Sequence, residues 1–341
     1  MERNSRSRIT EQKLFATTDD EEVLELEKDS GLTDRDKAFL RALSVCGVLR
    51  IEQVQKHYGN VSQYHKRRVE RFSAAGYIKR RAGYIEITIK GCRAAGIEEK
   101  PLRVQKWRRE HKAKIADLIY EMPEWKVTIG TEIKRQKELN PGMRIGAVIS
   151  KDSSEYAVYL LSENPLPLTV GIIWHEIQKL SEININRAVI FCPTPAAMTV
   201  FTEQLSQAER RLQEILVLPH PDGVHVLNRV NQESFKNLIV GKLPGLLPAN
   251  RVYVDYQWQG YYVCNLITND LIKRRHLKNY FESIINLENR PVIIICMSNQ
   301  LFFYRRLYPE ASFLVLSDDL SKILELNKGG ECHEPVASSG P

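Results

Sequence analysis

Apolar residues recur at helical spacing in the stretch that begins near residue 33. Thr33 can cap a first helix, and Gly47 ends its apolar face. The spacing predicts a second helix over 51–58 and a third over 62–75. Three short helices in close succession are typical of helix-turn-helix proteins.

The pattern changes from helical to alternating after the third predicted helix. A basic turn around residues 79–83 is followed by Tyr84–Ile89, in which apolar and polar residues alternate as in a half-buried strand. Three helices followed by a two-stranded hairpin is the order of a winged helix-turn-helix. In that fold the third helix enters the major groove of DNA.

A mixed pattern follows, with longer apolar runs that predict strands and helices in alternation. The predicted order is a helix from about residue 111, strands 127–133, 143–150 and 155–161, helix 172–183, strand 187–192, helix 199–208 and strand 214–218. A helix, three meandering strands, a helix and a further strand form the core order of the restriction-endonuclease-like fold. The fold class expected is therefore α+β, an N-terminal winged helix followed by a mixed α/β domain of this kind.

The C-terminal part repeats the order of the preceding half-domain. It contains strand 261–267, helix 274–285, buried strand 291–296, a further helix and strand 308–316. One interpretation is a pseudo-duplicated nuclease-like scaffold, and the other is a generic α/β domain that happens to alternate.

These patterns predict five segments along the 341-residue chain. They are a disordered acidic tail (1–31), a winged-helix domain (32–98), a restriction-endonuclease-like domain (99–218), a second α/β domain or half-repeat (219–326) and a disordered tail (327–341).

Charge is distributed unevenly, which points to a polyanionic partner. The chain has a net charge of +7, and residues 61–90 alone carry +6. A second basic stretch covers residues 100–114, whereas residues 19–29 are acidic. We therefore expect double-stranded DNA as the partner.

The basic residues gather on the predicted third helix and wing. The candidate DNA-binding residues are Ser62, Gln63, His65, Lys66, Arg67, Arg68, Arg71, Lys79, Arg80 and Arg81. Gln63, His65 and Arg67 are the candidates for reading bases, and the remaining cations are expected to contact phosphates. The alternatives are a solvated basic helix and a winged helix that binds protein.

Residues 33–218 resemble the replication-relaxation family of plasmid and conjugative-element proteins. The resemblance rests on Leu32–Asp36, on Arg67–Val69 through Gly76–Ile78, and on His111 opening the helix before Thr131-Glu132. It implies a winged helix joined to a restriction-endonuclease-like domain, and some relatives act as relaxases. The partners it implies are relaxase, replication or transfer proteins of a mobile element.

The acidic residues that the resemblance implies for a nuclease site are missing. A Pro-Asp-Ala tripeptide is replaced by Ile145-Gly146-Ala147, and strand 157–161 has no carboxylate. Glu132 alone stands at a plausible site position, and one carboxylate cannot build the usual metal site. We expect a catalytically degenerate domain without a cofactor. The alternative is an active Mg²⁺-dependent nuclease or relaxase that uses Glu132 with Asp152, Glu155 or Glu163.

Other residue patterns in the sequence predict no further metal site or disulfide. The six cysteines show no zinc or disulfide pattern. His220–His225 is interpreted as a tight turn between strands rather than a metal site. No apolar run reaches the length of a membrane span, and no signal peptide is recognised, so a cytoplasmic protein without a membrane partner is expected.

The function predicted from these observations is sequence-specific DNA binding in support of plasmid or mobile-element replication or conjugative transfer. A homodimer is a possible form because winged helices often act as dimers. A third interpretation is a winged-helix transcriptional regulator whose α/β region senses a ligand.

Overall fold

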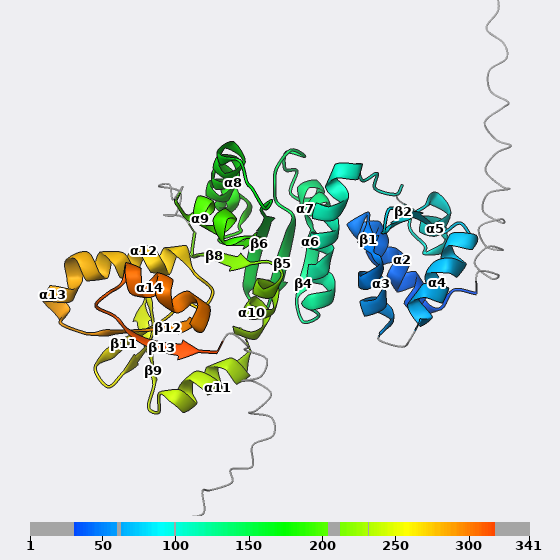
Figure 1. The fold of residues 1–341 in the computed structure, drawn as a ribbon. Coiled ribbons are helices and arrows are strands. Elements are labelled where there is room, and N and C mark those ends of the chain that lie inside the picture. Colours follow the sequence, from blue (N-terminus) through cyan, green and yellow to red (C-terminus); the bar gives the residue numbers. More distant parts are fainter. Residues whose placement is uncertain (1–30, 60–62, 99, 204–211, 231, 318–341) are drawn as a thin grey trace, which may run out of the picture. The chain divides into compact units, whose positions relative to one another are not determined.

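A computed structural model describes residues 31–59, 63–98, 100–203, 212–230 and 232–317 (Figure 1). The predicted tails at 1–31 and 327–341 therefore lie almost wholly outside the described residues. Contacts divide the chain into two units between Tyr120 and Glu121, and the fold is mixed α+β, as expected. No helix in the described ranges has both the length and the apolar character needed to cross a membrane.

In its described residues the first unit has four helices and a three-stranded sheet before its last helix. In chain order these are α2 (Asp34–Cys46), β1 (Leu49–Arg50), α3 (Ile51–Tyr58), α4 (Tyr64–Ala74), β2 (Ile78–Arg81), β3 (Tyr84–Ile87) and α5 (Ile89–Ala94). The sheet has the order β1-β3-β2 and is antiparallel. The three predicted helices and the hairpin are confirmed as elements, whereas the two-residue β1 was not predicted.

Buried aromatic and aliphatic residues hold these helices on the sheet. Phe39 of α2 stacks on Phe72 of α4, with their ring centroids 5.8 Å apart. Ile78, Ile85 and Ile87 supply the apolar face of the sheet. The predicted capping box is present, since Thr33 and Asp36 exchange hydrogen bonds at the start of α2.

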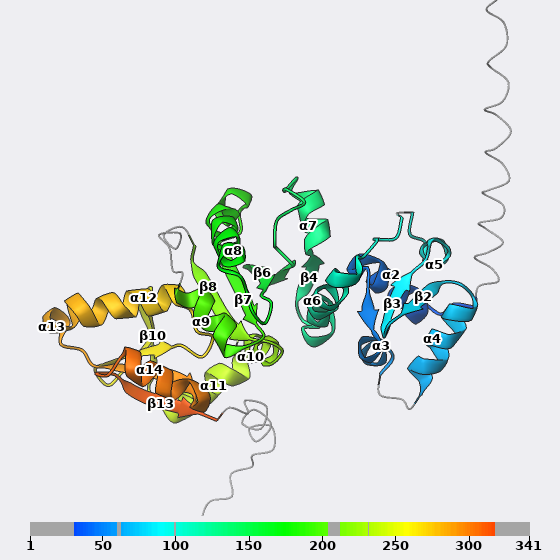
Figure 2. The same ribbon diagram turned by 45° about the horizontal axis from the view of Figure 1, so that its top comes forward.

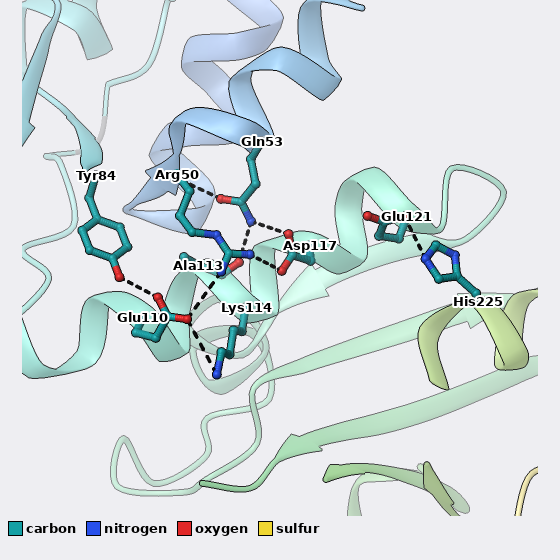
Figure 3. A network of polar contacts seen from close by, with 9 residues as sticks. All are labelled: Arg50, Gln53, Tyr84, Glu110, Ala113, Lys114, Asp117, Glu121 and His225. Carbon is teal, nitrogen blue, oxygen red and sulfur yellow. Dashed lines mark hydrogen bonds and ion pairs between the residues drawn. The ribbon is translucent and has the colours of Figure 1, made fainter. Parts of the chain in front are cut away.

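Helix α6 (Arg109–Glu121) follows a 3₁₀ turn at Lys106–Arg108, and nearly all of it belongs to the first unit. Buried Gln53 of α3 donates to the carbonyl of Ala113 (2.6 Å) and to Asp117 (2.8 Å), as Figure 3 shows. Arg50 also donates to Asp117, at 2.6 Å. The contact boundary therefore lies at 120/121, whereas the boundary predicted from the pattern was 98/99.

The second unit begins with a five-stranded mixed sheet. Its strands are β4 (Lys126–Ile129), β5 (Ala147–Lys151), β6 (Ser154–Leu160), β7 (Arg187–Cys192) and β8 (Glu214–Pro219), in that spatial order. The first three are antiparallel, and β6, β7 and β8 are parallel. The accompanying helices are α7 (Gly130–Gln136), α8 (Pro167–Lys179), α9 (Pro195–Glu203) and α10 (Asp222–Val230).

Two predicted elements of this sheet are wrong. The strand expected over 127–133 ends at Ile129, because the backbone turns into α7 at Gly130. A Cβ on Gly130 would lie 2.2 Å from the carbonyl oxygen of Ile145, so only glycine fits this close approach. The turn expected at His220–His225 does not connect two strands, since α10 begins at Asp222.

A second five-stranded sheet follows within the same unit (Figure 2). Its elements are α11 (Glu233–Lys242), β9 (Leu247–Arg251), β10 (Val254–Trp258), β11 (Tyr261–Asn265), α12 (Leu271–Asn279), a π-helical turn (Tyr280–Ile284), α13 (Ile285–Glu288), β12 (Val292–Met297), α14 (Leu301–Leu307) and β13 (Ser312–Leu316). Strands β9, β10 and β11 are antiparallel, and β11, β12 and β13 are parallel. Strand order and directions therefore match those of the first sheet.

The two sheets meet at Asp270, the N-cap residue of α12. Asp270 is 1% exposed and forms an isolated β-bridge with Leu216 of β8. Its carboxylate accepts from the amide of Ile215 (3.3 Å) and from that of Ile272 (2.9 Å). One side chain thus satisfies backbone donors in both halves of the second unit.

Candidate nucleic-acid interface

Helix α4 exposes a set of cations on the side opposite its apolar residues. Val69 and Phe72 are buried, whereas Lys66, Arg67 and Arg71 are exposed. The helical period separates these two sets, because residues three and four apart share a face. Three of the predicted DNA-binding residues are therefore available to a partner.

Arg68 points into the protein, contrary to the prediction. Its guanidinium pairs with Asp36, which is fully buried, and its Nε donates to the same carboxylate at 3.0 Å. Tyr58 also donates to Asp36, at 2.8 Å. Asp36 thus joins α2, α3 and α4, and Arg68 fixes the orientation of α4 rather than facing solvent.

One further candidate at the start of α4, His65, also needs correction. His65 is only 6% exposed, so it cannot read bases as predicted. Gln63 is exposed and has a left-handed backbone with φ of 59°. Ser62 lies outside the described residues. The periodicity did not reveal the burial of His65, because the exact start of α4 sets which residues face inward.

The β2–β3 hairpin carries the second group of cations. Lys79, Arg80 and Arg81 are all exposed. Ala82 and Gly83 connect the strands with φ of 48° and 82°, the positive values that a two-residue hairpin turn requires. This tight turn keeps the three cations on a short hairpin.

Contacts from α6 neutralise the acidic residue of this hairpin. Lys79 lies opposite Glu86 across the two strands, and Arg109 donates to Glu86 at 2.8 Å. Tyr84 likewise donates to Glu110 at 2.5 Å. The sequence pattern did not reveal Arg109, because the contact joins residues 23 positions apart.

The 3₁₀ turn before α6 adds an exposed aromatic residue to the basic surface of this unit. Trp107 is 69% exposed, and the Arg108 guanidinium lies 4.5 Å from its ring centroid. Lys106 and Arg103 are exposed beside it. Exposed aromatic rings flanked by arginines are common on nucleic-acid-binding surfaces.

The exposed cations of α4 and the hairpin share one electrostatic property. Within the described ranges, no hydrogen bond or ion pair joins a carboxylate to Lys66, Arg67, Arg71, Lys79, Arg80 or Arg81. Since α4 packs against β2, these six exposed cations lie on adjacent elements and outnumber the acidic residues there, Glu70 and Glu86. Such a cluster attracts polyanions and favours release of their counterions.

The positions that the resemblance assigns to a nuclease site hold no carboxylate, and Gly146, which replaces the Asp of the tripeptide, is half-buried. Ile145, Ala147 and Val158 are at most 2% exposed. Glu132 lies on α7 rather than on a strand and pairs with Arg135 at 2.9 Å. Hydrogen bonding from Arg135 holds the pKa of the Glu132 carboxyl below its usual value. Glu132 is thus engaged within its own helix.

The alternative acidic residues do not complete such a site with Glu132. Asp152 and Glu163 are exposed and Glu155 is half-buried. In the part of the chain that the structure describes, no three histidine, cysteine or acidic side chains are close enough to hold a metal ion. Glu176, a further buried carboxylate, accepts from the amide of Arg144 at 2.7 Å.

Comparisons with known proteins identify no relative. No protein-family model, curated protein or solved structure matches this chain.

Proposed function

We propose that this chain is a sequence-specific double-stranded DNA-binding protein. In this proposal residues 34–87 form a winged helix-turn-helix, α4 is the recognition helix, and the β2–β3 hairpin is the wing. Its role is that of an accessory protein in replication or conjugative transfer of a plasmid or mobile element.

The observation that carries the proposal is the cluster of six exposed cations on α4 and β2, none of which forms an ion pair within the described residues. In a winged helix these two elements meet the major groove and the flanking backbone. Arg67 and Gln63 remain the candidates for reading bases, because both are exposed and carry donors that suit base edges. Lys66, Arg71 and the hairpin cations would contact phosphates.

We propose that the second unit is a duplicated, catalytically inactive nuclease-like scaffold. The matching strand order and directions of its two sheets support a duplication more strongly than chance alternation. The lack of a carboxylate at Gly146 and along residues 157–161 supports inactivity, since a divalent ion needs oxygen ligands there. The scaffold would then serve as a second binding platform.

The test is selection of duplexes from a random library by the full-length protein, followed by anisotropy titrations at several salt concentrations. The proposal predicts one enriched sequence that is bound more tightly than scrambled DNA. The triple variant Lys66→Ala, Arg67→Ala, Arg71→Ala should lower affinity at least about tenfold and reduce the salt slope by about 2, about one for each of the two lost phosphate contacts.

A charge-matched control separates a specific interface from net charge. The variant Lys179→Ala, Lys242→Ala, Arg306→Ala removes three exposed cations from the second unit. It should leave affinity for the selected sequence nearly unchanged. Equal losses in the two triple variants, or no binding at moderate salt, would contradict the proposal.

The inactive-scaffold proposal is tested on the same DNA with Mg²⁺ or Mn²⁺ added. We expect no nicked or cut product with either ion. Metal-dependent cleavage that disappears in Glu132→Gln would show that an altered nuclease site is active.

A further inference from the structure

A cavity of about 900 Å³ lies within the second unit. It is separate from the proposed DNA interface, since all its lining residues belong to the second unit. Its volume falls in the range of sites that bury small organic molecules.

The cavity lies where the parallel strands of both sheets end. Cys192 and Pro219 end β7 and β8 of the first sheet, and Met297 ends β12 of the second. Ile267 lines it from the connection that follows β11. Ligands of α/β proteins bind preferentially at the carboxyl ends of strands, and here two such edges share one cavity.

Hydrogen bonds within the protein hold the polar side chains between the two sheets in place. Asn269 accepts from Arg274 (3.0 Å) and from Tyr304 (3.3 Å), and it donates to the Val217 carbonyl of the first sheet. Gln300 accepts from the Met297 amide at 3.0 Å and donates to the Ile267 carbonyl at 2.8 Å. The cavity therefore has a preorganised floor that links the two halves.

The remaining lining is mainly apolar, with one charge of each sign on α10. Met198, Val226 and Phe303 supply apolar surface. Arg229 is half-buried, and no ion pair or hydrogen bond to a carboxylate is recorded for it among the described residues. Asp222 is exposed at the other end of the helix, about 10 Å away along its axis. His225 lies between them and pairs with Glu121 at 3.6 Å (Figure 3).

We propose that this cavity binds an amphipathic organic anion. Its apolar body would lie against Met198, Val226 and Phe303, and its carboxylate, sulfonate or phosphate would pair with Arg229. A half-buried arginine without an acidic partner provides a strong, directional site for such an anion. Asp222 forms no ion pair with Arg229 within the described residues.

The test uses anilinonaphthalene sulfonate, an aromatic anion whose fluorescence rises in apolar surroundings, with the full-length protein. The expected result is saturable binding with one molecule per chain. Arg229→Gln should weaken this binding tenfold or more. Thr199→Trp should abolish it, because Thr199 is an exposed residue of the cavity lining and the larger tryptophan side chain would extend into the cavity. Arg306→Gln, an exposed arginine outside the lining, should bind like the unchanged protein.

Thermal melting of each variant checks that altered binding does not come from unfolding. The proposal is overturned if the probe does not bind below millimolar concentration. It is equally overturned if folded Arg229→Gln and Thr199→Trp both bind as tightly as the unchanged protein. DNA binding is measured separately, so loss of either property leaves the other testable.

Discussion

Arg68 forms a buried ion pair with Asp36, although its neighbours Lys66 and Arg67 are exposed. These three consecutive basic residues of α4 therefore have different roles. Arg68 orients the helix, and Lys66 and Arg67 are available to a partner.

Replacing Arg68 should destabilise the first unit rather than weaken DNA binding directly. Arg68→Met leaves the Asp36 carboxylate buried without its cation, which lowers the free energy of unfolding by about 3 kcal/mol. Hydrogen exchange of α3 and α4 amides measures this loss. The matched variant Arg67→Met should change stability by less than about 0.5 kcal/mol, and equal effects would contradict the assigned roles.

The hairpin turn should depend on Gly83. Gly83→Val places a β-branched residue at φ of 82°, which costs about 1–3 kcal/mol and should speed exchange of amides in β2 and β3. DNA affinity should fall with it. Ala82→Asn is the control, because asparagine before glycine favours this turn type, and it should slow exchange or leave it unchanged.

The attachment of α6 should depend on Gln53. Gln53→Leu removes one donor from the Ala113 carbonyl and one from Asp117, which costs about 1–3 kcal/mol. Limited proteolysis and exchange of α6 amides should both report the loosened helix. Gln55→Leu alters an exposed residue of the same helix and should have no such effect.

Asp270 should make the second unit less stable as pH rises. Burial, reinforced by Glu214 and opposed by Lys273, raises the pKa of its carboxyl from 3.8 to about 7. The folded state therefore holds this proton more tightly than the unfolded state, so stability is present below pH 3.8 and is lost as pH rises towards 7. Between pH 5 and 8 the loss is about 2 to 3 kcal/mol.

Asp270→Asn isolates this effect, since the amide oxygen can still accept from Ile215 and Ile272. Urea unfolding at pH 5 and pH 8 should show the unchanged protein losing stability relative to the variant. A constant difference between the two proteins at both pH values would exclude the raised pKa.

Two glycines of the second unit should respond oppositely to the same substitution. Gly130→Ala forces a Cβ against the Ile145 carbonyl and should destabilise α7 and β5 by at least about 1 kcal/mol. A Cβ on Gly171 of α8 meets no atom within 4 Å, so Gly171→Ala should stabilise by up to about 1 kcal/mol. Thermal melting compares the two directly.

Periodicity was sufficient to predict elements whose two faces differ. The helices of the first unit were predicted because buried and exposed positions are separated in sequence. The strands over 187–192 and 291–296 were predicted because each is a nearly continuous apolar run, whereas β9 and β10 were not predicted.

Long-range contacts account for what the sequence could not predict. The strand expected over 127–133 ends early because Gly130 approaches Ile145, and a local pattern does not contain that approach. Arg68 is a basic residue like its neighbours Lys66 and Arg67. Only its ion pair with Asp36 distinguishes it from them. The cavity likewise depends on residues of two sheets and leaves no motif in the sequence.

The bridge between Leu216 and Asp270 bears on how the second unit avoids aggregation. Strand β8 is an edge strand, and a bare edge offers unpaired amides and carbonyls to any other chain. The segment at Asp270 covers part of that edge, so the second half of the unit protects the first. The two halves should therefore fold together, and a fragment that ends after β8 should self-associate.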